Sequence, residues 1–147
     1  MNDKWDARFL KLALEVSTWS KDDTGVGCVL AESNRVISLG FNGPPVGTPD
    51  DLNPDARRLR SLHAEINALL FAQGHHFTDA YVTRPPCCQC MAALIQAGVL
   101  RVVALDQPLG RRWLESTNEA ERLAVDAGVE YCIVDPAEVE AAPGQPR

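Results

Sequence analysis

Two short motifs constrain this chain more than any other feature: H-A-E at residues 63–65 and P-C-C-Q-C at residues 86–90. One imidazole and two thiolates are ligands that suit zinc, and three of them leave its fourth coordination position open for water. That layout is typical of a catalytic zinc site, because structural zinc sites are closed by four protein ligands. The neighbouring carboxylate is a residue type that transfers protons. We therefore predict that His63, Cys87 and Cys90 bind zinc and that Glu65 moves protons.

Both motifs fall at predicted helix starts. The residue pattern predicts a helix from Cys87 to about Gln96, in which Cys87 and Cys90 stand three apart and share one face. They also lie in its first turn, where the helix dipole favours a thiolate. For the other motif, Ser61 is the predicted N-cap of a helix over residues 62–73. Residues two apart do not share a helix face, so the sequence alone does not show that the glutamate reaches the metal.

The order of elements predicts the fold class. Apolar spacing indicates a helix over residues 5–19 and a hairpin over residues 26–40, followed by alternating helices and strands up to residue 134. Strand–helix–strand alternation requires a partly parallel sheet, to which the hairpin adds an antiparallel pair. We predict an α/β protein, a three-layer α/β/α sandwich with a mixed five-stranded sheet. Residues 1–135 would form one domain and residues 136–147 a flexible C-terminal tail.

Composition narrows the classes of protein that this chain can represent. A length of 147 residues suits one domain, and the formal net charge of −6 counts against a dedicated nucleic-acid binder. Charges interrupt the N-terminus before any apolar run forms, and no run approaches the roughly 20 residues of a membrane helix. We expect a cytoplasmic protein with no membrane partner. In a reducing compartment, five cysteines with one CxxC indicate metal chemistry and not a disulfide framework.

Three polar segments are candidates for substrate contact. Ser20 and Lys21 could bind a phosphate, although an ordinary solvated turn is the commoner use of such a loop. Asn42 lies in a rigid segment rich in glycine and proline, where its amide suits a sugar hydroxyl or a base edge; it would also suit a left-handed turn before glycine. The three arginines within residues 57–60 form either a solvated turn or a phosphate contact.

The two zinc motifs together favour catalysis over two simpler alternatives. A CxxC alone would favour a structural zinc or a redox dithiol. The added H-x-E, the proline before Cys87 and the placement of both motifs at helix starts favour an active centre. The combined H-x-E and P-C-x-x-C signature resembles that of zinc nucleobase deaminases, which implies that Glu65 would carry a proton from water to a ring nitrogen and later protonate an exocyclic amine, which leaves as ammonia. The net reaction would be hydrolytic deamination.

The chain resembles the cytidine/deoxycytidylate deaminase superfamily, and within it the deoxycytidylate (dCMP) deaminases. The zinc motifs carry the resemblance to the superfamily, and the similarity runs over about residues 5–133. The narrower resemblance rests on four segments: S-K-D at residues 20–22, G-F-N-G-P-P-V-G at 40–47, H-A-E-I-N-A at 63–68 and I-Q-A-G-V at 95–99. It implies a cytidine deaminase-like fold and a zinc-dependent conversion of dCMP to deoxyuridylate and ammonia. Some relatives also accept 5-methyl- or 5-hydroxymethyl-dCMP.

The resemblance also implies roles for residues around the metal. Asn42 would lie beside the nucleoside, and Val26 would form a wall of the base pocket. The backbone N–H of Ala64 would meet the pyrimidine carbonyl. In relatives an aromatic residue after the fourth strand closes over the substrate; here Trp113, next to Arg112, is the nearest candidate.

Assembly and regulation follow from the same resemblance. Members commonly form hexamers, so we expect a homo-oligomer, and many are regulated by dCTP and dTTP, which are possible effectors here. Many relatives hold a second, structural zinc with extra Cys and His before the H-A-E motif. Residues 48–62 contain neither residue type, so we predict one zinc per protomer.

Two alternatives remain at this point. The first is a deaminase of another substrate: cytidine, cytosine, or adenosine, free or in tRNA. The acidic charge counts against tRNA, which would need a basic face. The second is a non-catalytic, zinc-stabilised binding module, against which Glu65 argues because a structural zinc needs no proton shuttle.

Overall fold

The computed structural model describes residues 4–50 and 53–143 of the chain. No helix in these ranges is long and apolar enough to cross a membrane. In chain order the elements are α1 (Lys4–Ser17), β1 (Gly27–Glu32), β2 (Arg35–Phe41), α2 (Pro54–Arg60), α3 (Ala64–Ala72), β3 (Asp79–Val82), α4 (Cys88–Gln96), β4 (Arg101–Leu105), α5 (Arg111–Ala127), β5 (Glu130–Val134) and α6 (Pro136–Ala141).

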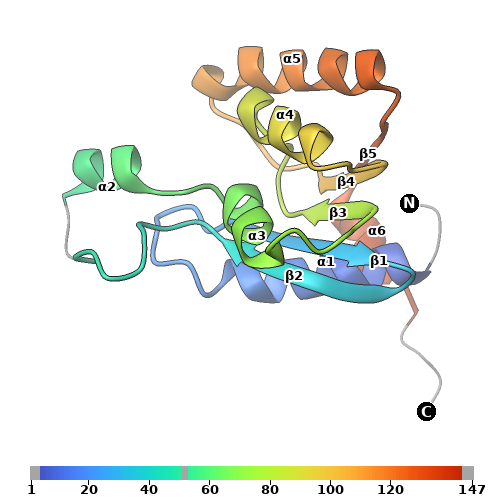
Figure 1. Cartoon of the computed structure of the whole chain (residues 1–147), viewed down its shortest axis with the longest axis horizontal. Coiled ribbons are helices and arrows are strands. Elements are labelled where there is room, and N and C mark those ends of the chain that lie inside the picture. The colour runs from blue at the N-terminus through green and yellow to red at the C-terminus, as the bar shows by residue number, and fades with distance from the viewer. Residues whose placement is uncertain (1–3, 51–52, 144–147) are drawn as a thin grey trace.

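The strands form one mixed sheet in the order β2-β1-β3-β4-β5 (Figure 1). Strand β1 pairs antiparallel with both β2 and β3, whereas β3, β4 and β5 run parallel to one another. The antiparallel pair β1–β2 is the predicted hairpin, and the parallel strands are joined by α4 and α5 as crossover helices. The predicted mixed five-stranded sheet is therefore confirmed.

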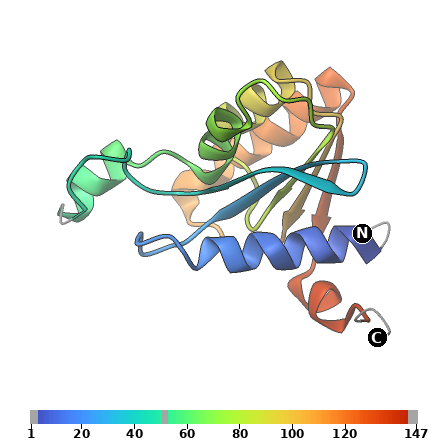
Figure 2. The same cartoon turned by 60° about the horizontal axis from the view of Figure 1, so that its bottom comes forward.

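Helices cover both faces of the sheet, as Figure 2 shows. Alternate residues of each strand point to opposite faces, so neighbours such as Leu30 and Val29 belong to different cores. One core lies beneath α3, α4 and α5 and includes Met91 and Leu94. The other lies beneath α1 and α6 and includes Leu10. This is the predicted three-layer α/β/α arrangement.

Gly40 sets how closely α3 approaches the sheet. A Cβ atom at Gly40 would lie 2.3 Å from the backbone oxygen of Ala64 and 2.4 Å from the backbone nitrogen of Ala68. Any side chain there would push against the first turns of α3, so only glycine allows the backbone contact. Because α3 begins directly after His63, this contact also places the first zinc motif.

Helix α3 begins two residues later than the sequence predicted. Leu62 is held in an extended bridge with Gly43, whose N–H donates to the Leu62 carbonyl at 3.1 Å and whose carbonyl accepts from the Leu62 N–H at 2.8 Å. The bridge keeps Leu62 out of the helix, so His63 becomes the N-cap and Ser61 instead ends α2. Cys87 is likewise the N-cap of α4 and not its first helical residue.

The C-terminal segment also differs from the prediction of a flexible tail from residue 136. Pro136–Ala141 form α6, whose N-cap Asp135 accepts a hydrogen bond from the Ala137 N–H at 2.9 Å. Val139 is 1% exposed and packs in the core beneath α1. The composition of this segment did not predict the helix, because α6 has only one buried residue, Val139, and therefore no apolar repeat. Residues 144–147 lie outside the described residues.

Helix α2 has no buried residue and projects from the body of the molecule together with the segment that precedes it (Figure 1). Asn53 caps it by accepting a hydrogen bond from the Ala56 N–H at 2.9 Å. Without a core contact, polar interactions must hold α2 in place.

Candidate metal centre and substrate pocket

The predicted zinc ligands come together at the N-terminal ends of α3 and α4. Nδ1 of His63 lies 3.5 Å from Sγ of Cys87 and 3.3 Å from Sγ of Cys90. All three ligand atoms lie within 4.8 Å of one another. Among the described residues, no other group of three potential ligand side chains lies this close. These are the three residues that the sequence predicts as zinc ligands.

The local structure explains why these side chains face one another. His63 and Cys87 are the N-caps of their helices, but neither caps with its side chain, so the imidazole and the thiol are free to turn towards the cluster. Ser116 of α5 supplies the missing cap of α4, because its Oγ accepts a hydrogen bond from the Cys88 N–H at 2.8 Å. The cap thus comes from a different helix.

The chemistry of the cluster fits zinc. Hydrogen bonds from Cys90 and His63 to the Cys87 sulfur lower the pKa of Cys87, and the contact with Cys87 raises the pKa of His63. Thiolate is the form of cysteine that binds a metal. A soft set of two sulfurs and one imidazole nitrogen matches the preference of Zn²⁺ and leaves one position for an exchangeable ligand.

Glu65 lies in the first turn of α3, 4% exposed, and still lines the same cavity as His63 and Cys87. Burial raises the pKa of its carboxyl group. The structure thus places Glu65 in the same cavity as two of the zinc ligands, a point that the spacing left open. Glu65 can lie there because the helix begins at Ala64, which leaves His63 in an extended conformation outside the helical turn.

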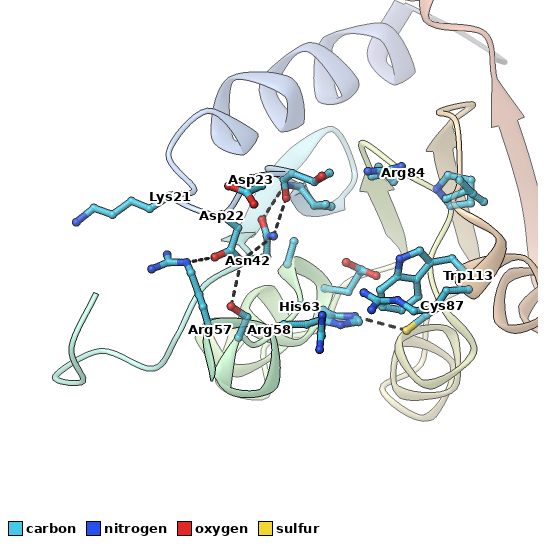
Figure 3. Close-up of a pocket in the computed structure, with 18 of the residues that line it drawn as sticks. Lys21, Asp22, Asp23, Asn42, Arg57, Arg58, His63, Arg84, Cys87 and Trp113 are labelled. Atoms are coloured by element: carbon cyan, nitrogen blue, oxygen red, sulfur yellow. Dashed lines mark hydrogen bonds and ion pairs between the residues drawn. The ribbon is translucent and has the colours of Figure 1, made fainter. Parts of the chain in front are cut away.

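A cavity of about 610 Å³ opens above the metal centre (Figure 3). Its floor contains Val26, Ala64, Glu65 and the metal ligands His63 and Cys87, whereas Cys90 lies buried below. Its rim is charged and is formed by the loop after α1, by α2, by the end of β3 and by the start of α5. The charged rim residues are Lys21, Asp22, Asp23, Asp50, Arg57, Arg58, Arg84 and Arg112.

Asn42 lines the cavity, but its side-chain amide forms hydrogen bonds with the loops around it. Its Oδ1 accepts from the Val26 N–H at 2.8 Å, and its Nδ2 donates to Asp22 Oδ2 at 3.0 Å and to the Thr24 carbonyl at 2.9 Å. Both amide protons are therefore used, and only a lone pair of Oδ1 remains for a ligand. Ser20 does not line the cavity; its hydroxyl donates to the Asn42 carbonyl at 2.8 Å.

The remaining predicted contacts also lie at the cavity. The Trp113 ring lies edge-on to the His63 ring, with centroids 6.0 Å apart, and the Arg112 guanidinium stands 4.9 Å from the Trp113 centroid. Lys21 reaches the rim, where it pairs with Asp50 at 2.6 Å on the exposed surface. In Figure 3, the Lys21 side chain extends away from the metal end.

Sequence reasoning missed the interaction that joins Asp22, Arg57 and Ser61 at the cavity. Arg57 forms an ion pair with Asp22, and the Ser61 hydroxyl donates to Asp22 at 3.1 Å. These partners lie 35 and 39 residues apart, so no spacing rule connects them. Arg84 was missed too; its guanidinium donates to the Pro108 carbonyl and ties the end of β3 to the loop before α5.

Residues 3–106 match the family described as the cytidine and deoxycytidylate deaminase zinc-binding region. The chain belongs to this family. It is 41% identical over 137 residues to an "Uncharacterized deaminase in luxG 3'region" of Aliivibrio fischeri, with 88% of this chain and 93% of that protein covered. It is 30% identical over 141 residues to the deoxycytidylate deaminase of Mus musculus, with 87% and 78% covered.

A solved structure of similar fold is the dCMP deaminase of the cyanophage S-TIM5 in complex with dCMP and dUMP. It is 23% identical, with a TM-score of 0.76 over 91% of this chain and 99% of that one. This likeness supports the cytidine deaminase-like fold. The family match and the His63, Cys87 and Cys90 cluster confirm the predicted zinc cofactor and a deaminase of the zinc-dependent class.

Proposed function

We propose that this protein hydrolyses dCMP, or a 5-substituted dCMP, to the corresponding deoxyuridylate and ammonia. The observation that carries the proposal is the joint placement of the His63, Cys87 and Cys90 cluster and the buried Glu65 on the floor of one cavity. Several relatives, including those of mouse and human, are deoxycytidylate deaminases at 30% and 31% identity. A cavity of about 610 Å³ also has room for a nucleotide.

In the proposed reaction, His63, Cys87 and Cys90 hold zinc and Glu65 moves the protons. Bound zinc lowers the pKa of a water molecule to roughly 7, so that hydroxide is available at neutral pH. Glu65 accepts a proton from the attacking water and gives it to N3 of the cytosine ring. Once the C–O bond to C4 has formed, Glu65 would take the proton of the new C4 hydroxyl group and pass it to the amino group. The C–N bond then breaks, C4 becomes a carbonyl carbon and ammonia leaves.

The surroundings of Glu65 suit this role. A carboxyl group with an ordinary pKa would hold a proton too weakly near neutral pH, whereas burial raises the pKa of Glu65 towards that range. Ala64 and Val26 border the same floor, and the backbone N–H of Ala64 belongs to the unpaired first turn of α3. We expect this N–H to donate to the pyrimidine carbonyl.

The rim supports a phosphorylated substrate. Of its cations, Arg57 is committed to Asp22, Lys21 pairs with Asp50, and Arg84 donates to a backbone carbonyl. Among the described residues, no carboxylate lies within ion-pair distance of Arg112, and Arg58 has only an exposed contact of 3.3 Å with Asp55. We infer that Arg112 and Arg58 bind the phosphate, since guanidinium groups suit phosphate geometry.

The test is ammonia release from a panel of dCMP, 5-methyl-dCMP, deoxycytidine, dCTP, cytosine and adenosine. The expected result is the highest kcat/KM for dCMP or its 5-methyl form. Preference for deoxycytidine would contradict the phosphate assignment, and turnover of adenosine alone would contradict a pyrimidine substrate. Addition of dCTP and dTTP to the dCMP assay tests whether they act as effectors.

Assembly as a homo-oligomer, with a hexamer favoured, remains part of the proposal. Large apolar side chains stay exposed on the single chain, among them Leu59 on α2 and Leu70 and Phe71 on α3. Contact between copies would cover such residues. Light scattering of the zinc-loaded protein gives the number of chains, and a monomer at micromolar concentration would contradict this part of the proposal.

A further inference from the structure

Asp22 is a half-buried residue at which three separate segments meet. Its carboxylate accepts hydrogen bonds from Arg57 of α2, from the Ser61 hydroxyl at 3.1 Å and from Asn42 Nδ2 at 3.0 Å. The side chains of Asp22 and Arg57 are only 15% and 14% exposed. Ion pairs at this level of burial are screened less by solvent than surface pairs, and their geometry is better defined.

The ion pair matters because α2 has no buried residue. Within the described part of the chain, Arg57 is the α2 residue whose side chain reaches the body, and Ser61, the C-cap of α2, donates to the same Asp22 carboxylate. Arg57 also donates to the Asp50 carbonyl at 2.7 Å, which draws the segment before α2 to the same point. Arg58, the next residue, lines the cavity. Whatever holds Arg57 therefore also places Arg58 at the rim.

The ion pair between Asp22 and Arg57 also determines that Arg58, and not Arg57, is available to a ligand. A carboxylate in direct contact satisfies the charge of Arg57, so this side chain serves the structure and not the substrate. A substrate phosphate near an unpaired Asp22 would meet a negative charge, and the ion pair removes that repulsion.

We propose that Asp22 is a positioning residue for phosphate recognition: by binding Arg57 it docks α2 at the rim of the cavity and orients Arg58 towards the 5′ end of the substrate. The inference rests on the proposed nucleotide specificity but concerns residues outside the metal centre. It predicts that Asp22 affects the binding of a nucleotide more than that of a nucleoside.

The experiment compares Asp22→Asn, Arg57→Gln and the double variant with dCMP and with deoxycytidine. We expect each single variant to raise KM for dCMP about tenfold and to change kcat for dCMP less than threefold. The kcat/KM for deoxycytidine should also change less than threefold, and zinc content should be unchanged. The double variant should lose no more than either single variant, because one ion pair is removed in each case. Asp126→Asn, an exposed carboxylate at the far end of α5, is the charge-matched control and should behave as wild type.

Hydrogen exchange provides a readout that needs no substrate. Amide exchange over residues 56–61 should become several times faster in Asp22→Asn and in Arg57→Gln, with exchange in the sheet unchanged. Unchanged exchange in α2, an equal loss for dCMP and deoxycytidine, or additive losses in the double variant would each overturn the inference. A wild-type enzyme that ignores dCMP would instead overturn the proposed function, while the exchange measurement would still decide the role of Asp22 in docking α2.

Discussion

The two ends of the cavity are built in different ways. At the metal end, every functional side chain lies on an element that packs on the sheet, and the metal-binding N-termini are held by a glycine contact with β2 and a cap from α5. At the rim, α2 has no buried residue and depends on the ion pair between Arg57 and Asp22. The metal end is anchored by packing, whereas the part of the rim formed by α2 is anchored by charge.

This difference matches the demands of the proposed reaction. Proton transfer and metal binding require atoms held to within a fraction of an ångström, which only a packed scaffold provides. Recognition of a phosphate requires charge at the right distance and tolerates more movement. Changes at the metal end should therefore act on zinc and kcat, and changes at the rim on KM.

Replacement of a zinc ligand should have the largest effect. Cys90→Ala removes one of three protein ligands, so we expect loss of bound zinc and no measurable deamination. Metal analysis of the purified variant and ammonia release give the two readouts. Cys88→Ala is the matched control, because Cys88 is the neighbouring thiol outside the cluster, and it should keep one zinc. Zinc at wild-type level in Cys90→Ala would contradict the assigned ligand set.

Glu65→Gln should separate catalysis from metal binding. The amide has nearly the same shape but cannot carry a proton, so kcat should fall by about 10²–10⁴-fold while zinc content stays at one per chain. Steady-state kinetics with metal analysis on the same sample is the measurement. Glu15→Gln, an exposed carboxylate on α1, serves as control. A normal kcat in Glu65→Gln would contradict the proposal that Glu65 transfers protons.

Arg112→Gln tests the rim. Loss of a charged hydrogen bond costs about 1.5–3 kcal/mol, so KM for dCMP should rise by roughly one to two orders of magnitude. The kcat should change little, and deoxycytidine turnover should be unaffected. Arg122→Gln, on the same helix but paired with Glu119 outside the cavity, is the control. A fall in kcat with KM unchanged would mean that Arg112 acts in the chemical step. It would contradict the expectation that residues of the rim affect KM and residues of the metal end affect kcat.

Ser116→Ala should give the smallest effect and sharpens the description of the metal end. Loss of a helix cap costs about 1 kcal/mol, which corresponds to about fivefold weaker zinc retention. A competition assay with a chromogenic chelator measures it. Asn118→Ala, exposed on the same helix, should match wild type. Equal zinc retention in Ser116→Ala and wild type would show that the cap does not support the ligands.

The sequence alone determined the sheet, its mixed pairing and the nature of the metal centre. Alternation of apolar residues depends on local geometry, and a CxxC at a helix start places two thiols on one face whatever surrounds it. The zinc ligands could therefore be predicted from spacing, and the structure brings them within 4.8 Å of one another.

Only the tertiary structure decided that Glu65 lines the same cavity as the zinc ligands His63 and Cys87, because that depends on where α3 begins. The Gly43–Leu62 bridge, a contact between distant parts of the chain, delays this start to Ala64. The partnership of Asp22 with Arg57 and the cap from Ser116 have the same origin. Each joins groups that are separated by 28 or more residues and that meet only after the sheet has formed. Local sequence patterns do not predict such contacts. A charged or hydroxyl side chain is interpreted from sequence as a solvated surface residue, because its partner is brought beside it only by the tertiary structure.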